Sequence, residues 1–200
     1  MHKTFWFKIH WFFGFVFGIL LLLIGVSGAV LSYEKEILQA INKDTYFVNI
    51  PQDKQILSTK EILEKYQTEN PDSKINSISF SSDKSSSVVL NIASKDPKQR
   101  KGESIYLNPY TAEVLPKIEY REFFSFIRSL HRWLAFEGDA RTIGKNIVAI
   151  STIACIILTI GGVIVYWPRV KNNFLRSFTF SFKHKKRAFL STMHSAIGMW

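Results

Sequence analysis

Two long apolar segments without a charged residue divide the chain. Residues 11–33 and residues 147–167 contain no Asp, Glu, Lys or Arg. A helix needs about 20 apolar residues to cross ~30 Å of hydrocarbon, and both segments reach that length. We therefore predict transmembrane helices within residues 1–33 and 143–167. The small residues at 27–29 leave a cleaved signal peptide as an alternative for the first, although its apolar run is longer than the usual signal core.

Between these segments the pattern is that of a small water-exposed domain. Residues 34–57 read as a helical extension of the first span, ended by Pro51, followed by a linker. Ser58 and Glu61 form a capping-box pattern, which predicts that a helix begins there and ends near residue 70.

Short alternating segments follow this helix. We expect strands at 75–80, 88–92 and 104–107, the start of a fourth at 112–115, and turns at 83–86 and 96–102. Residues 58–118 are thus predicted to form an α+β domain made of one helix and an antiparallel meander. A core this small is marginal, so packing on the spans or on a second copy of the chain would help it.

The remaining segments connect or follow the spans. Residues 119–142 are predicted to form an aromatic interfacial helix between Tyr120 and Leu134, because Trp and Tyr gather at membrane interfaces. Pro168 is expected to close the second span, and residues 168–190 to form a basic loop. Residues 191–200 resemble the start of a third span. The apolar stretch that ends the chain is too short to cross a bilayer, so we expect it to continue in a longer protein, the alternative being that it lies in the interface.

Charge is segregated along the chain. Residues 34–142 are balanced, whereas the rest of the sequence carries the whole net charge of +10, mostly after the second span. Because positive residues beside spans mark the cytoplasmic side, we predict a cytoplasmic N-terminus, residues 34–142 outside, and residues 168–190 inside. Bases in such positions are explained by topology and indicate contact with the lipid bilayer rather than with nucleic acid.

Three of the five histidines stand beside apolar segments. His10 and His194 are each followed by glycine four residues later, and the topology places both at the cytoplasmic side, where two imidazoles could ligate one haem. His131 lies on the outer side, where the sequence has no second histidine. Ionisable residues at membrane depth are costly and therefore candidate functional residues, and histidine is a common haem ligand. Ordinary helix packing, interfacial solvation or a surface position is the alternative for each histidine.

Small residues recur at helical spacing in the two predicted spans. On each span they would form one face that lets a helix or a flat cofactor come close. The faces contain Gly14, Gly18, Gly25 and Ser32 in the first span, and Gly144, Ser151, Cys155, Thr159, Gly162 and Tyr166 in the second. The single cysteine excludes an internal disulfide, and no hydrolase triad, phosphate loop or zinc-protease motif is present in the sequence.

Three blocks of the chain resemble the PepSY-associated transmembrane proteins. They are His-Trp-Phe-Phe-Gly at 10–14 with the apolar run to Gly28, the strand-turn-strand sequence at 105–115, and Leu-His-Arg-Trp-Leu at 130–134 with the span that ends in Tyr-Trp-Pro-Arg at 166–169. The segment at 194–198 is similar to the opening of the third span of that family. Ala112 stands where the family often has glycine.

The resemblance implies a four-span bacterial inner-membrane protein with an extracytoplasmic PepSY domain. Some members look like ferric-siderophore reductases that pass electrons through haems bound by helix histidines. For this chain it implies haem b, with His10 and His194 at the inner haem and His131 at the outer haem beside a partner beyond residue 200. Arg132 or Arg128 would pair with a propionate. The partners would be a ferric siderophore and a quinol or cytoplasmic reductant. The alternative is a non-enzymatic membrane-anchored module that binds a peptide or peptidase.

Overall fold

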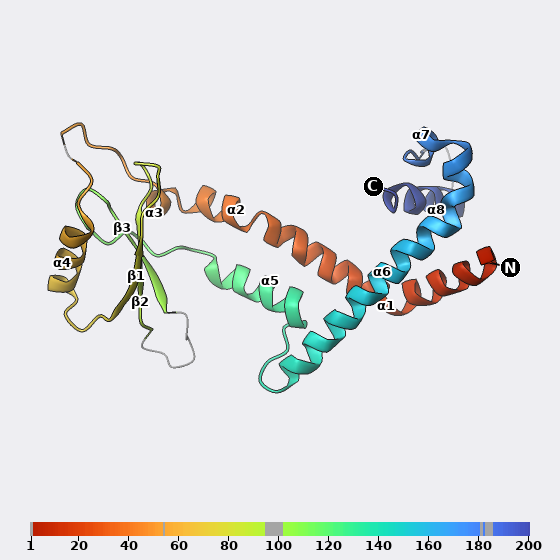
Figure 1. Ribbon diagram of the computed structural model, residues 1–200, viewed down its shortest axis with the longest axis horizontal. Helices are drawn as coiled ribbons and strands as arrows, with labels where there is room; N and C mark the ends of the chain where they lie inside the picture. The colour runs from red at the N-terminus through yellow and green to blue at the C-terminus, as the bar shows by residue number, and fades with distance from the viewer. Residues whose placement is uncertain (1, 54, 95–101, 181, 183–185) are drawn as a thin grey trace. The chain divides into compact units, whose positions relative to one another are not determined.

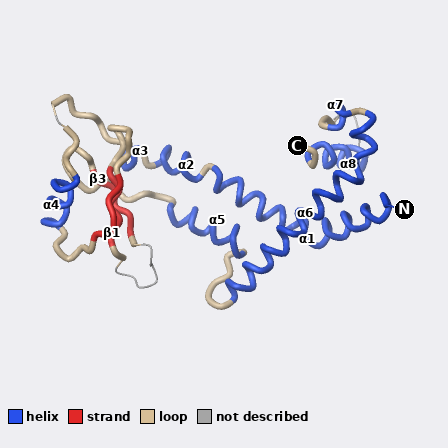
Figure 2. Tube along the Cα trace, in the orientation of Figure 1, coloured by secondary structure: helices blue, strands red, loops and turns tan. Residues whose placement is uncertain are grey.

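The computed structural model describes residues 2–53, 55–94, 102–180, 182 and 186–200. These residues form two compact units, shown in Figure 1 by chain position and in Figure 2 by secondary structure. The first unit joins Met1–Ser32 to Ser125–Trp200 and is helical. The second unit, Tyr33–Phe124, contains the strands.

The helical unit is built on α1 (His2–Ser32) and α6 (Ala140–Asn172). Both helices are long and apolar enough to cross a bilayer. Gly161 of α6 lies against His10, whereas Leu158 lies against Gly14, so numbers fall along α6 as they rise along α1 and the helices pack antiparallel. Two such helices, together with a separate unit that contains strands, fit a membrane protein with an α+β domain.

Pro168 does not end the second long helix, contrary to the sequence-based prediction. It lies inside α6, which continues to Asn172. Proline lacks the N–H that would reach the carbonyl four residues earlier, but long membrane helices tolerate this loss because neighbouring groups satisfy the freed carbonyl. The charge-free segment ends at Trp167, whereas the helix continues for five more residues to Asn172.

The first long helix also does not extend unbroken to Pro51. It ends at Ser32, and α2 (Glu34–Ile41) and α3 (Lys43–Tyr46) follow as separate helices. The second break lies at Asn42, which is buried and non-helical. Its side chain donates to the Leu38 carbonyl and accepts from the Glu119 amide, at 2.9 and 2.7 Å. These hydrogen bonds compete with helix continuation, which is the usual behaviour of asparagine.

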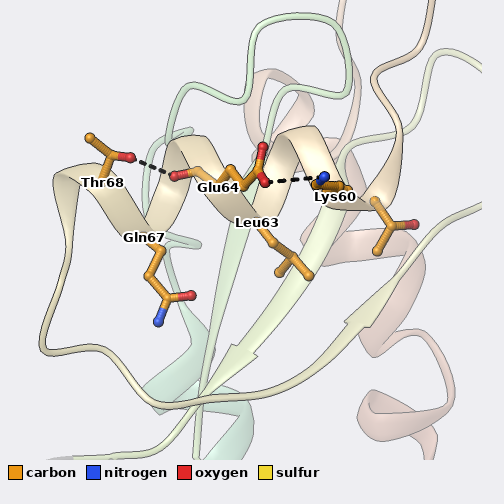
Figure 3. Close-up of a pocket in the computed structure, with 6 residues that line it drawn as sticks. Lys60, Leu63, Glu64, Gln67 and Thr68 are labelled. Atoms are coloured by element: carbon orange, nitrogen blue, oxygen red, sulfur yellow. Dashed lines mark hydrogen bonds and ion pairs between the residues drawn. The ribbon is translucent and has the colours of Figure 1, made fainter.

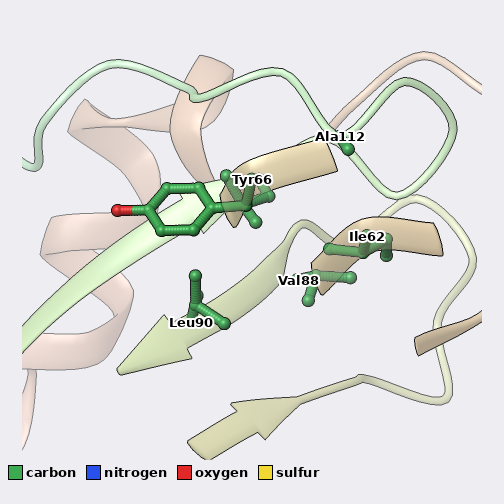
Figure 4. Close-up of a cluster of buried hydrophobic side chains, with 6 residues drawn as sticks. Ile62, Tyr66, Val88, Leu90 and Ala112 are labelled. Atoms are coloured by element: carbon green, nitrogen blue, oxygen red, sulfur yellow. The ribbon is translucent and has the colours of Figure 1, made fainter. Parts of the chain in front are cut away.

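In the second unit α4 (Thr59–Glu69) packs on a three-stranded sheet. Ser58 caps α4 with the predicted capping box, because its hydroxyl accepts from the Glu61 amide while the Glu61 carboxylate accepts from Ser58. The strands are β1 (Ile75–Ser79), β2 (Val88–Ile92) and β3 (Glu103–Leu107), antiparallel in the order β1-β2-β3. Helix and meander are confirmed. Figure 4 shows the core between them, made of Ile62, Tyr66, Val88, Leu90, Leu107 and Ala112.

The predicted fourth strand at 112–115 is wrong. Only an isolated bridge joins Val114 to Leu107. The chain reverses too tightly for a strand, since Ala112 adopts the left-handed region with φ of 63°. Glycine suits that conformation best, so alanine at this position carries strain. Of the turn predicted at 96–102, only Gly102 lies among the described residues.

Three shorter helices complete the described chain. They are α5 (Arg121–Trp133), α7 (Phe174–Ser177) and α8 (Lys186–Ile197). The helix predicted between Tyr120 and Leu134 is confirmed as α5. At its end Leu134 and Ala135 are both left-handed, with φ of 56° and 57°, and this corner redirects the chain toward α6.

Candidate functional site

His10 lies where α1 packs against two consecutive glycines of α6. A Cβ atom at Gly162 would come within 3.2 Å of the His10 Cε1 atom, and one at Gly161 within 3.5 Å of the His10 Cβ atom. The absence of side chains on these glycines therefore gives the imidazole its place. We call this pair of glycines the inner seat.

A backbone carbonyl fixes the proton on this ring. The His10 Nδ1 atom lies 2.9 Å from the carbonyl oxygen of Leu158. A carbonyl oxygen only accepts hydrogen bonds, so Nδ1 carries the proton and donates it. In the neutral imidazole the lone pair then resides on Nε2. Metal-binding histidines commonly have this arrangement, with one nitrogen held by a carbonyl and the other free to ligate.

His194 of α8 meets His10 within the same helical unit. The two ring centroids are 6.1 Å apart and the rings are tilted by 69°. The structure thus brings together the two histidines that sequence reasoning paired.

His131 of α5 repeats the arrangement at the other end of α1. Its Nδ1 atom lies 3.0 Å from the Ile24 carbonyl oxygen and 3.2 Å from the Ser27 hydroxyl oxygen. A Cβ atom at Gly28 would lie 2.9 Å from His131 Cε1, so Gly28 is the outer seat. Ser27 is buried, and its hydroxyl donates to the Leu23 or Ile24 carbonyl while it can accept from His131. Nδ1 is again the protonated nitrogen.

The two histidine positions share one side of α1 and are separated by its length. His10 and Gly28 are 18 residues apart, which is about five full turns of 3.6 residues and about 27 Å of helix. That distance approaches the ~30 Å of a hydrocarbon core. One helix therefore connects the two histidine positions across a membrane-sized distance.

The predicted small-residue faces are only partly correct. A Cβ atom at Gly18 or Gly25 would meet nothing within 4 Å in the described part of the chain, and Cys155 and Thr159 are exposed. A helix advances 100° per residue, so steps of four and seven drift away from the His10 direction, whereas a step of 18 returns to it. Of the predicted residues, Gly14 is in contact and Gly144 and Ser151 are buried on α6, whereas Gly28, Ala154 and Gly161 also take part and were not predicted.

Arg132 lies in a pocket beside His131 in the helical unit. The pocket holds about 480 Å³ and is lined by His131, Arg132, Trp133, Arg141, Thr142, Lys145 and Val148. The Arg141 and Arg132 guanidinium carbons lie 3.8 and 5.1 Å from the centroid of the Trp133 ring. We call this the cationic pocket. Arg128, the other arginine considered from the sequence, does not line it.

Close packing holds α5 beside this pocket. Gly144 of α6 is buried, and a Cβ atom there would overlap the carbonyl oxygen of Trp133. The last turn of α5 thus rests directly on the backbone of α6. This contact sets the height of His131 along the two long helices.

No group of three or more His, Cys, Asp or Glu side chains that could hold a metal ion occurs among the described residues. Two histidines, by contrast, are a donor set that a haem iron takes as axial ligands. The histidine pair fits a haem in this respect, with one donor from each of two helices.

Sequence reasoning missed the residues that orient the histidines. Gly28, Ser27 and the carbonyls of Ile24 and Leu158 carry no motif, and a backbone acceptor has no sequence signature. The Gly-Gly pair at 161–162 was available as a signal, since paired glycines in an apolar helix mark a close approach. Arg141 and Lys145 were visible as charges at the entry of a predicted span.

This combination of apolar spans, a separate α+β unit and oriented helix histidines defines a class of membrane protein. The model of the PepSY-associated TM region matches residues 7–200, and the chain belongs to that family. It is accordingly a membrane protein in contact with the lipid bilayer. Among curated proteins, none matches the chain.

Proposed function

We propose that this protein is a haem-binding electron-transfer protein of the bacterial inner membrane that reduces ferric iron, held by a siderophore, on the extracytoplasmic side. One electron from a quinol or a cytoplasmic reductant converts Fe(III) to Fe(II). In this proposal the second unit is an extracytoplasmic PepSY-like domain and α8 begins a third span. The N-terminus is cytoplasmic.

The histidine pair of His10 and His194 is the observation that carries the proposal. Two imidazoles from different helices lie 6.1 Å apart at one end of the helical unit. His10 presents a free Nε2 because the Leu158 carbonyl holds its Nδ1 proton. These residues would hold a haem b, which supplies one-electron chemistry when bound.

His131 extends the proposal to the other side of the membrane. Its Nδ1 proton is held by the Ile24 carbonyl, so the same nitrogen, Nε2, is left to ligate. A second ligand would have to come from a group other than the described histidines. Arg132 lines the pocket next to this ring, where its guanidinium suits a propionate carboxylate. The two histidine positions, separated by ~27 Å of helix, would place the two haems toward opposite sides of the membrane.

An absorption spectrum of the purified full-length protein tests this proposal. We expect a Soret band whose intensity falls by about half in H10A and H194A, with H2A as a histidine control outside the apolar segment. A protein without a Soret band, or one whose band is unaffected by H10A and H194A, would contradict the proposal. Retention of the band in H131A at full intensity would restrict haem to the inner position.

A second function is favoured by a shallow depression on the outer face of α4. Figure 3 shows it, lined by Thr59, Lys60, Leu63, Glu64, Gln67 and Thr68. In this alternative the second unit binds a peptide or a peptidase and the spans only anchor it. Leu63→Asp in the full chain would then abolish binding of a peptidase partner, whereas H10A and H131A would leave that binding unchanged. If substitutions of the polar residues that line this depression, such as Lys60 and Gln67, leave partner binding unchanged, this alternative is contradicted.

A further inference from the structure

The cationic pocket is not explained by the topology of the chain. Positive residues accumulate on the cytoplasmic side of spans, and the basic segment after α6 follows that tendency. Arg132, Arg141 and Lys145 gather at the opposite end of α6, in its first two turns and in the last turn of α5. Basic residues at this end need another reason.

Within the described residues these cations have no acidic partner. The ion pairs Lys60–Glu64 and Lys117–Glu103 involve none of the three cations. Asp139 occupies the N-cap of α6 without a side-chain capping bond, and neither it nor Glu137 lines the pocket. Three cations that converge without a carboxylate leave a local excess of positive charge.

The pocket is built in a way that holds guanidinium groups in place. Arg141 stacks on Trp133 at 3.8 Å, which fixes the plane of the guanidinium while its N–H edge remains able to donate. Thr142 adds a hydroxyl donor, and the volume of about 480 Å³ lies within the range of small-molecule sites. The first turn of α6 contributes the positive end of the helix dipole, although the N–H groups of Arg141 and Thr142 donate to the Gly138 and Asp139 carbonyls.

We infer that the cationic pocket is a binding site for an oxyanion group, a carboxylate or a phosphate, presented to the extracytoplasmic end of the helical unit. Arginine forks recognise such groups in bidentate fashion, and Lys145 adds a point charge. The group can belong to a soluble chelate or to a lipid headgroup. The site itself does not require haem; the reading that a soluble ligand is an anionic ferric chelate rests on the proposed function.

Binding of citrate and of its redox-inert gallium(III) chelate to the full-length protein tests the inference. The protein is placed in nanodiscs of phosphatidylcholine and titrated by calorimetry at low and high salt. We expect saturable binding that weakens with salt and that drops at least about tenfold in R132Q/R141Q. The double variant R169Q/K171Q is the matched control, because it removes two positive charges from the other end of α6, and it should bind as the parent does.

Two further arms identify the source of the anion and guard against misfolding. If a phosphatidylglycerol headgroup is the occupant, nanodiscs containing that lipid will block citrate binding, and R132Q/R141Q will lose the preference for it. K145Q changes one exposed residue, so it should weaken binding in a protein that still melts as the parent does.

The inference is overturned if neither citrate, its gallium chelate nor inorganic phosphate binds and phosphatidylglycerol shows no preference. Binding that survives R132Q/R141Q and K145Q overturns it equally. Because no electron transfer is measured, a protein without haem can still bind the anion, and a haem protein can fail to bind it. The experiment can therefore contradict the anion site without contradicting the proposed function, and the reverse.

Discussion

Different interactions stabilise each of the two units of this protein. In Tyr33–Phe124, a capped helix and a sheet bury apolar side chains such as Ile62 and Leu90, as water-exposed domains do. In the helical unit the residues at the helix contacts are mainly glycines and polar groups, while large apolar residues face outward. Moving an apolar side chain from lipid into a helix contact gains no hydrophobic free energy, so close approach and hydrogen bonds determine which helices associate. The same substitution should therefore have consequences of different size in the two units.

Removing a leucine side chain gives the largest expected difference. Leu90 is fully buried in β2, and Leu90→Ala should destabilise the second unit by about 2–5 kcal/mol because it leaves a cavity. Leu22 of α1 is 68% exposed, and Leu22→Ala should change stability by less than ~0.5 kcal/mol. Hydrogen exchange of β2 and α1 in the full chain measures both effects. Equal losses of stability in Leu90→Ala and Leu22→Ala would contradict the difference between the two units.

Adding a methyl group tests the close contacts of the helical unit. Gly144→Ala places a Cβ atom on the Trp133 carbonyl, so α5 must shift, at a cost of about 1–3 kcal/mol or more. Gly18→Ala is the control, because a Cβ atom there meets nothing within 4 Å. Thermal unfolding in nanodiscs compares the two variants with the parent. An unaffected Gly144→Ala would mean that α5 does not rest on α6.

The two histidine seats differ in tightness. The Gly28→Ala Cβ atom would lie 2.9 Å from His131, whereas Gly162→Ala comes no closer than 3.2 Å to His10. We expect about 1–2 kcal/mol for the outer seat and less for the inner seat, since the ends of side chains can move. Nitrogen NMR of the imidazoles should show a changed Nδ1 hydrogen bond at His131 in Gly28→Ala. An unchanged signal with Gly28→Ala would argue against the seat.

The smallest expected effect is the pH dependence of the cap on α4. Hydrogen bonds from the Ser58 side chain and backbone lower the pKa of Glu61 below 4.5. The ionised carboxylate is therefore favoured in the folded state, and its contribution is present above the unfolded pKa and lost as the pH falls through the folded one. Hydrogen exchange of α4 between pH 6 and pH 3 should follow this loss.

Ser58→Ala provides the control for that measurement. Losing the cap should cost about 1 kcal/mol at neutral pH, and the acid-dependent part should shrink because Glu61 has lost its principal partner. The helices of the other unit should not respond. An undiminished pH dependence in Ser58→Ala would assign the effect to a different carboxylate.

Periodicity and local motifs predicted those parts of the fold that depend on neighbouring residues. The capping box at Ser58, the meander and the helix ending at Trp133 required only short-range patterns. The break at Asn42 escaped prediction because its side chain is held by Glu119, which is distant in sequence. The inner histidine pair was anticipated from recurring spacing. Its orientation was not, since the carbonyl of Leu158 is chosen by helix packing alone.

The 18-residue interval between His10 and Gly28 fixes both their distance along α1 and the shared direction in which they face. Inserting one residue between them would turn one histidine position by about 100° relative to the other, whereas four residues would leave only ~40° of misalignment. The span can therefore change length only in steps close to whole turns if both positions are to survive. A bilayer of different thickness has to be met by tilting the helix rather than by adding single residues.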